Sequence, residues 1–278
     1  MYNTARPWTH DHMITSNYFI TFESSIQYDP KELIKGNVFS YQPNHKFRIG
    51  LNLKNATNAD SMQWFTFNSS YGFLHVSNAW EETANDFGAG SGAGTGADTV
   101  VIWMPMSTDF DMQGNSRNKW YMHEIRLNIH TGSSSITCID DTQIVEFPRI
   151  HPAYLSQKCK YSYAAIMHVD GLFNGVVKYD HDFRVPKARI QLPPGYICGE
   201  VIPIPKEGLA GTASDGVYLG TFVYNTYTKL SEFHVYDGTS MSPTPVVVLD
   251  TAGKRVQNGF HAEWMSEERL QKHVLAHS

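Results

Sequence analysis

Cysteine is scarce in this chain. Its 278 residues contain only Cys138, Cys159 and Cys198, and no two of them form a Cys-x-x-Cys pair. Such a set builds neither a disulfide framework nor a cysteine zinc site, so we expect a reduced, cytoplasmic protein. Long apolar runs are also missing: TVVIWMPM at 99–106 is far shorter than the roughly 20 residues that a membrane-spanning helix needs. The polar start of the chain predicts no secretory signal peptide.

Charge is low as well. Charged residues make up 18% of the chain, the net charge is −5, and lysine and arginine do not cluster. This distribution excludes the basic surface that nucleic-acid binding requires, so we expect no nucleic-acid partner. Aromatic residues are abundant, at 13%, which is typical of globular β proteins. The 13 histidines exceed what a core of this size needs and are a first hint of metal chemistry.

The hydrophobic pattern predicts short strands along most of the chain. In residues 46–54, Phe47, Ile49, Leu51 and Leu53 alternate with polar residues, which is the period-two pattern of a half-buried strand. Further strands or hairpins are predicted for four segments: 124–139 with a His-Thr-Gly turn, 216–225, 231–238 and 244–250.

Helical periodicity is convincing only at 266–273, where Ser266 is the predicted N-cap. Strands and turns are spread evenly, so we expect residues 1–278 to form a single all-β domain. The residues themselves leave a barrel, a sandwich and a propeller open, and no exact internal repeat selects the propeller. The glycine-rich segment 88–97 is predicted to be a flexible surface loop; it lacks the Gly-Lys-Ser/Thr ending of a phosphate loop.

Three histidines stand in distinctive contexts: His10 in THDHMITSNYFI, His75 in YGFLHVSNAWEE and His261 in VQNGFHAEW. Each lies in or beside a short apolar or aromatic stretch, so each alone is explained as a hydrogen-bonded structural histidine. The Tyr-Asp-His-Asp sequence at 179–182 is predicted to be a polar turn rather than a metal site. Five other histidines lie in alternating strands or turns and are expected at the surface: His123, His130, His168, His181 and His234.

With the residues around them, the three histidines resemble motifs of the carotenoid oxygenase family, which includes carotenoid cleavage dioxygenases, lignostilbene dioxygenases and the retinoid isomerase. HDHMITSNYFI is similar to the family's His, Thr five residues later, and Asn-Tyr. HVSNAWEE is similar to His-x-x-Asn-Ala-Trp/Tyr-Glu-Glu, and RVQNGFHAEW to Arg-Val-Pro-x-Gly-Phe-His-Gly. VEFPRIHPAY resembles Glu-Phe-Pro-x-Ile, and ICGEVIPIP resembles Gly-Glu-Pro. The five matches keep the family's order from Thr9 to Trp264, with Gln257 in place of proline and Ala262 in place of glycine.

The resemblance implies an Fe(2+) centre with His10, His75 and His261 as metal ligands, since neutral imidazoles suit first-row divalent ions. It also implies that Glu146 and Glu200 support catalysis by accepting hydrogen bonds from the outer ring nitrogens of the ligands. From the residues alone, Glu146 is also explained as a strand-edge carboxylate paired with a nearby arginine.

His12 is an alternative or additional ligand. Residues i and i+2 of a strand point to the same face, so His10 and His12 would both reach one metal in a regular strand. The family register, set by Thr15 and Asn17, selects only His10.

The fold that the resemblance implies is a seven-bladed β-propeller, whose inner strands direct side chains toward a common axis. The family uses four histidines, the first of them upstream of the HDH segment, and this chain starts nine residues before His10. It therefore resembles the C-terminal half to two-thirds of a family member, that is, an N-terminally truncated propeller without its opening blades. Trp80, Glu81 and Glu82 are expected to shape the cavity wall.

The function that the resemblance implies is a non-haem Fe(II) dioxygenase that cleaves a conjugated C=C bond of a carotenoid, apocarotenoid or stilbene-like substrate to carbonyl products. Its partners would be O2 and a hydrophobic small molecule in an apolar tunnel, and peripheral contact with a membrane is compatible with the resemblance. The alternative is a truncated, catalytically inactive member that binds a hydrophobic ligand or none. A glycosidase propeller ranks third because no carboxylate pair stands out. With one ligand and part of the propeller absent, residues 1–278 alone are expected to show little activity.

Overall fold

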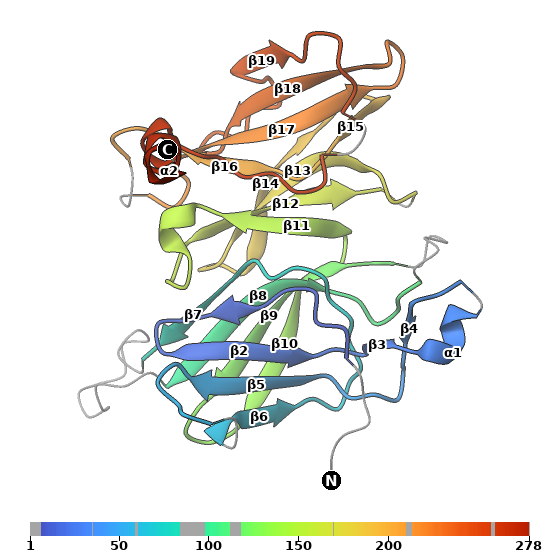
Figure 1. The fold of residues 1–278 in the computed structure, drawn as a ribbon, viewed down its shortest axis with the longest axis vertical. Coiled ribbons are helices and arrows are strands. Elements are labelled where there is room, and N and C mark those ends of the chain that lie inside the picture. The colour runs from blue at the N-terminus through green and yellow to red at the C-terminus, as the bar shows by residue number, and fades with distance from the viewer. Residues whose placement is uncertain are drawn as a thin grey trace.

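The computed structural model describes residues 7–34, 36–58, 61–83, 98–111, 118–168, 170–209, 213–256 and 259–277. The predicted flexible loop at 88–97 lies outside these ranges. Antiparallel strands dominate the described residues, and the chain runs from the lower to the upper half of Figure 1. No described helix is both long enough and apolar enough to cross a membrane.

Two four-stranded antiparallel sheets form the first half of the chain. A short insertion after residue 23 and before residue 48 consists of β3 (Ile26–Tyr28), α1 (Pro30–Leu33) and β4 (Phe39–Tyr41). The first sheet has the order β1 (Met13–Ile14), β2 (Tyr18–Glu23), β5 (Arg48–Leu53), β6 (Gln63–Thr66). In the second, the neighbours are β7 (Asn78–Glu82), β8 (Thr99–Met106), β9 (Tyr121–Asn128) and β10 (Ser134–Asp140).

The second half is a nine-stranded sheet that contains two four-stranded meanders. Strand β15 (Tyr196–Cys198) joins them, because it pairs with one strand of each. The third meander of the chain comprises β11 (Val145–Ile150), β12 (Tyr161–Met167), β13 (Phe173–Asp180) and β14 (Val185–Gln191). The fourth comprises β16 (Ile202–Pro205), β17 (Val217–Asn225), β18 (Leu230–Asp237) and β19 (Val247–Asp250). Two helices complete this half: the 3-10 helix η3 (Pro152–Tyr154) and α2 (Glu267–His277).

Most local predictions are confirmed. The 124–139 hairpin is the β9–β10 pair, and the segments 216–225 and 231–238 pair as β17 and β18. Ser266 caps α2, because its hydroxyl oxygen accepts a hydrogen bond from the backbone N–H of Arg269 at 3.3 Å. One detail is wrong: Leu53 is 44% exposed, because it lies at the end of β5, beyond the core that covers Ile49.

The sheets stack face to face, so strands β7 and β8 of the second sheet are buried on both sides, whereas β10 is largely exposed. On β8, Val100 and Ile102 pack into a core shared with the first sheet. Val101 and Trp103, on the opposite face, pack against the third meander. Successive strand residues face opposite sides, so a strand between two sheets needs apolar residues at every position. The uninterrupted TVVIWMPM run reflects this double burial.

His181, which directly follows β13 of the third meander, packs against the second sheet. Its ring is stacked on Trp80 of β7, with centroids 5.5 Å apart, and tilted against Trp103 of β8 at 4.2 Å. Its Nδ1–H donates to the backbone oxygen of Cys159 at 2.9 Å, and its Nε2 accepts from the hydroxyl of Ser162 at 2.8 Å. The neutral ring uses both nitrogens, and burial lowers the pKa of His181 to about 4.

The surface prediction for five histidines is therefore wrong for three of them. His123, His181 and His234 are buried, with exposed fractions of 6%, 5% and 8%, whereas the side chains of His130 and His168 are 64% and 54% exposed. Strand alternation identifies the two faces of a sheet, but it does not show whether another sheet or loop covers the second face. Three of these polar faces are covered.

Protonation of His181 should destabilise the fold. Its folded-state pKa of about 4 lies below the unfolded value of 6.5, so the unfolded chain binds more protons between these values. The free energy of unfolding should be complete above pH 6.5 and fall toward pH 4, by up to about 3 kcal/mol. Urea unfolding across this range measures the effect. His181→Gln should flatten the dependence, and the exposed control His168→Gln should not; an equal slope in wild type and His181→Gln would contradict the prediction.

Candidate metal centre

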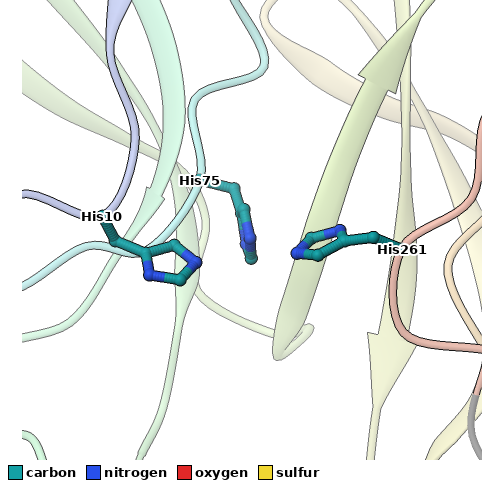
Figure 2. A group of neighbouring side chains, drawn as sticks. All are labelled: His10, His75 and His261. Atoms are coloured by element: carbon teal, nitrogen blue, oxygen red, sulfur yellow. The ribbon is translucent and has the colours of Figure 1, made fainter.

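The three ligands predicted from the sequence lie close together in the structure. His10 precedes β1, His75 precedes β7, and His261 lies in the segment between β19 and α2. One nitrogen from each ring lies within 4.8 Å of those of the other two. Figure 2 shows the three rings turned toward one another from separate chain segments. The fold thus gathers donors that are far apart in sequence.

His12 is not part of this cluster. His10 and His12 both precede β1, so the same-face rule for strand residues does not apply to them. Asp11 lies between them: its Oδ1 accepts from the backbone N–H of His12 and its Oδ2 from that of Val76, both at 2.8 Å. The second bond joins this segment to the one that carries His75, while the His12 side chain lines a separate groove.

Glu81 of β7 holds the β1–β2 turn in place. Its Oε1 accepts from the Thr15 hydroxyl at 2.5 Å and from the Asn17 backbone N–H at 2.7 Å, and its Oε2 accepts from the Asn17 side chain at 2.7 Å. Thr15 and Asn17 therefore tie the first sheet to the second. The expectation that Trp80, Glu81 and Glu82 shape the cavity wall is wrong, because none of them lines either cavity beside the histidines.

Glu146 of β11 is 1% exposed and lies against His75, with its Oε2 2.6 Å from the ring Nδ1. A carboxylate accepts, so Nδ1 carries the proton and Nε2 presents its lone pair. That Nε2 is buried and, among the described residues, has no hydrogen-bond partner. A buried acceptor without a partner is costly, and a metal ion on the histidine side would satisfy it.

Glu200, which precedes β16, lies in the corresponding position at His261. Its Oε1 is 3.5 Å from His261 Nδ1 and accepts from Arg149 Nε at 2.8 Å. Its Oε2 accepts from the backbone N–H of Ala262 at 2.9 Å. The alternative interpretation of Glu146, as a carboxylate paired with an arginine, is therefore wrong: the arginine pairs with Glu200.

A β-bulge places these groups. Residues Phe147 and Pro148 of β11 oppose a single residue of β12, and the register shifts between Glu146 and Arg149. Phe147 has a φ of 52°, in the left-handed region that bulky side chains avoid. Its ring lies against both ligands, with centroid distances of 5.1 Å to His75 and 5.3 Å to His261.

The electrostatics of the three histidines differ. Burial opposes the charged form of His75, but the hydrogen bond and negative charge of Glu146 outweigh it and raise the pKa of His75. Burial lowers the pKa of His10, and the neighbouring His75 adds to the effect. The carboxylates beside this cluster of imidazoles supply negative charge, which is favourable for a cation.

A cavity of about 460 Å³ adjoins the cluster. His10, His75 and Glu146 form its polar end beside the cluster, and the lining also includes the polar residues Asn118 and His168. The rest is largely aromatic and includes Trp8, Trp120, Phe110, Phe147, Phe173 and Phe260. A space of this size and lining suits a rigid apolar molecule held with one part next to the histidines.

Three contributors were not identified from the sequence: Asp11, Phe147 and Arg149. Asp11 lies between two histidines, and the sequence gives no sign that its carboxylate reaches the segment of His75. Phe147 and Arg149 lie within the VEFPRI motif, but a strand pattern does not reveal a bulge, so their directions were hidden. Only the proline after Phe147 was a signal, because proline in a strand favours bulges and edges.

The donor set fits one first-row divalent ion. Two imidazole nitrogens on one ion are at most about 4.2 Å apart, twice a metal–nitrogen distance of ~2.1 Å; the three nitrogens, all within 4.8 Å of one another, would therefore need to move by only a few tenths of an ångström to bind one ion. Nitrogen donors with carboxylates on their outer sides are typical of such sites. Among the described residues, no fourth histidine, cysteine or carboxylate joins the group.

The chain is similar to known proteins along most of its length. The chain matches the family model RPE65, retinal pigment epithelial membrane protein, over residues 3–266. The carotenoid 9,10(9',10')-cleavage dioxygenase of Crocus sativus is 31% identical over 94% of this chain and 49% of its own length. For carotenoid 9,10(9',10')-cleavage dioxygenase 1 of Arabidopsis thaliana the values are 30%, 96% and 50%. The chain thus spans about half the length of these curated relatives.

Solved structures share the fold. The Pseudomonas brassicacearum lignostilbene dioxygenase has a TM-score of 0.75 and 16% identity, over 93% of this chain and 55% of that chain. Cobalt-substituted Synechocystis apocarotenoid oxygenase has a TM-score of 0.71 and 16% identity, over 91% and 51%. These matches confirm the predicted all-β fold, a partial seven-bladed propeller whose blades are the four-stranded sheets. Matched by the family model along nearly its whole length, the chain belongs to the carotenoid oxygenase family, that of the retinal pigment epithelial membrane protein.

Proposed function

We propose that this chain carries the iron centre of a non-haem dioxygenase that cleaves a conjugated C=C bond oxidatively. The observation that supports this most directly is the convergence of three histidine nitrogens within 4.8 Å at the polar end of an aromatic cavity. His10, His75 and His261 would hold the ion. Because the chain spans about half the length of its curated relatives, the activity itself is part of the proposal.

In the proposed reaction, the alkene C=C bond and the O–O bond break and two C=O bonds form. Each product receives one oxygen atom, so the balance needs no external reductant. Iron(II) supplies the reduced metal that lets dioxygen react with a closed-shell alkene. The chain's own contribution is to hold the ligands in one tautomer and to place the double bond beside them.

Each carboxylate has a defined part in this scheme. Glu146 keeps the proton of His75 on Nδ1, so that Nε2 faces the ion. Glu200 lies on the same outer nitrogen of His261. A carboxylate at the outer nitrogen of an imidazole fixes the orientation of the ring and makes the inner nitrogen a better electron-pair donor to a metal ion.

The cavity favours apolar, rigid substrates. Its aromatic lining offers stacking surfaces for a polyene or aryl-alkene and excludes water from the reacting bond. We propose a carotenoid, an apocarotenoid or a stilbene-like phenylpropene as the substrate. Peripheral contact with a membrane, from which such a molecule would be drawn, stays a prediction.

A second candidate function is binding of a hydrophobic ligand without catalysis. The observation in its favour is that three, not four, histidines converge in the described part of the chain. The two candidates share the cavity and differ in whether bound ligand is oxidised.

The metal assignment predicts about one Fe(2+) per chain, measured by anaerobic reconstitution and metal analysis. His10→Ala, His75→Ala and His261→Ala should each abolish retention of iron, because each removes one of the converging nitrogens. His12→Ala is the matched control and should retain most of the iron, because its side chain lines another groove. Equal losses in His10→Ala and His12→Ala would show that the pair chelates the ion.

Glu146→Gln should lower metal affinity by about 10–100-fold, because the amide is a weaker acceptor for His75 Nδ1–H than the carboxylate. Calorimetric titration with Co²⁺ measures the change. Glu23→Gln is the control, since Glu23 pairs with Arg48 in the first sheet. Wild-type affinity in Glu146→Gln would make Glu146 a structural residue only.

Activity separates the two candidate functions. The purified chain, loaded with iron and supplied with oxygen, is incubated with a panel of carotenoids, apocarotenoids and stilbenes. Aldehydes that form with wild type and not with His75→Ala support the dioxygenase. Ligand binding, seen as a shift of the polyene spectrum, without any aldehyde favours the binding protein and overturns cleavage by this chain.

A further inference from the structure

The segment that carries His261 lies outside the sheets and is held by hydrogen bonds. Residues 259–264 belong to no strand, and the His261 side chain is 47% exposed. Glu200 binds this segment at both ends: its backbone N–H donates to the Gly259 oxygen at 2.8 Å, and its Oε2 accepts from the Ala262 N–H at 2.9 Å. The position of His261 therefore depends on Glu200.

Glu200 in turn depends on Arg149. The carboxylate is 3% exposed, and Arg149 Nε donates to its Oε1 at 2.8 Å. A second guanidinium nitrogen of Arg149, Nη2, donates to the backbone oxygen of Ala262 at 3.4 Å. One planar side chain thus contacts both the carboxylate and the segment that the carboxylate holds, a geometry that lysine does not reproduce.

Arg149 also faces the metal site directly. With Asp11, it lines a polar cavity of about 270 Å³ that includes all three histidines. As an isolated positive charge, Arg149 would repel a cation bound there. Its pairing with Glu200 offsets this repulsion and holds the carboxylate oxygen that lies 3.5 Å from His261 Nδ1.

We propose that Arg149 is a positioning residue for the metal centre, acting through Glu200 on His261 and not on His75. The bulge in β11 makes this possible, because it directs Glu146 to His75 and Arg149 to Glu200 from one short segment. The proposal rests on the proposed metal centre, and it adds a third layer to the His261 ligand: arginine, carboxylate, imidazole.

Double-mutant cycles test the route of this effect, with Co²⁺ affinity measured by calorimetry. Arg149→Gln should weaken binding about 10-fold, at the lower end of the range for groups behind a ligand. In a Glu200→Gln background the same change should cause no further loss, since its route is already broken and an unpaired guanidinium is removed. In a Glu146→Gln background the two losses should multiply, because that carboxylate acts on a different histidine.

Arg149→Lys should retain part of the affinity through its charge and a single hydrogen bond. Arg48→Gln, which removes an arginine from the first sheet, is the control and should bind Co²⁺ as wild type does. Thermal unfolding without metal checks the fold, and Arg149→Lys serves as the test variant if Arg149→Gln does not fold.

Other results would overturn the proposal. Unchanged or tighter Co²⁺ binding in Arg149→Gln would show that the arginine is only a nearby charge. Losses that multiply in both backgrounds would show a general structural role. Absence of Co²⁺ binding in the wild-type chain would instead refute the metal centre itself, so the two failures are distinguishable.

Discussion

Between Glu146 and Arg149, strand β11 accommodates one more residue than its partner strand, and Phe147 takes a left-handed backbone conformation. In a regular strand, residues 146 and 149 would point to opposite faces of the sheet. The extra residue changes this parity, so both side chains reach the histidine cluster. The conformation costs about 1–3 kcal/mol, and burial of the Phe147 ring among aromatic and imidazole rings stabilises it.

The sequence contained enough to predict the strands and the three histidines. Alternation in residues 46–54 and 124–139 identified strands because those segments have one face more buried than the other. The motif around His10 selected it over His12 through Thr15 and Asn17, whose contacts with Glu81 now explain why those residue types occur there. The motif therefore predicted which of the two histidines lies in the cluster, and the contacts of Glu81 give its physical reason.

The rest needed the three-dimensional arrangement. His181 looked like a turn residue because no local pattern shows that Trp80 and Trp103 of another sheet will enclose it. Glu82 looked like a cavity residue because it follows a ligand motif, yet it is buried and paired with Arg126. Both errors have one origin: strands such as β7 and β8 are covered on both faces, and sequence periodicity does not show what covers the second face.

Strand β15 joins the third and fourth meanders into one nine-stranded hydrogen-bonded sheet, and no described strand of the first two sheets pairs with that sheet. The two halves of the chain therefore share no described strand pairing; their contacts include a backbone hydrogen bond from the Val145 N–H to the Trp120 oxygen at 2.9 Å and the bonds of the Asn78 side chain to the backbone oxygens of Tyr154 and Gln157. His10 and His75 belong to the first half and His261 to the second, so an ion held by all three would act as a staple across a seam that has no backbone ladder. Opening of the seam and release of the ion would then be a single event, and the free energy of metal binding would add to the cohesion of the two halves.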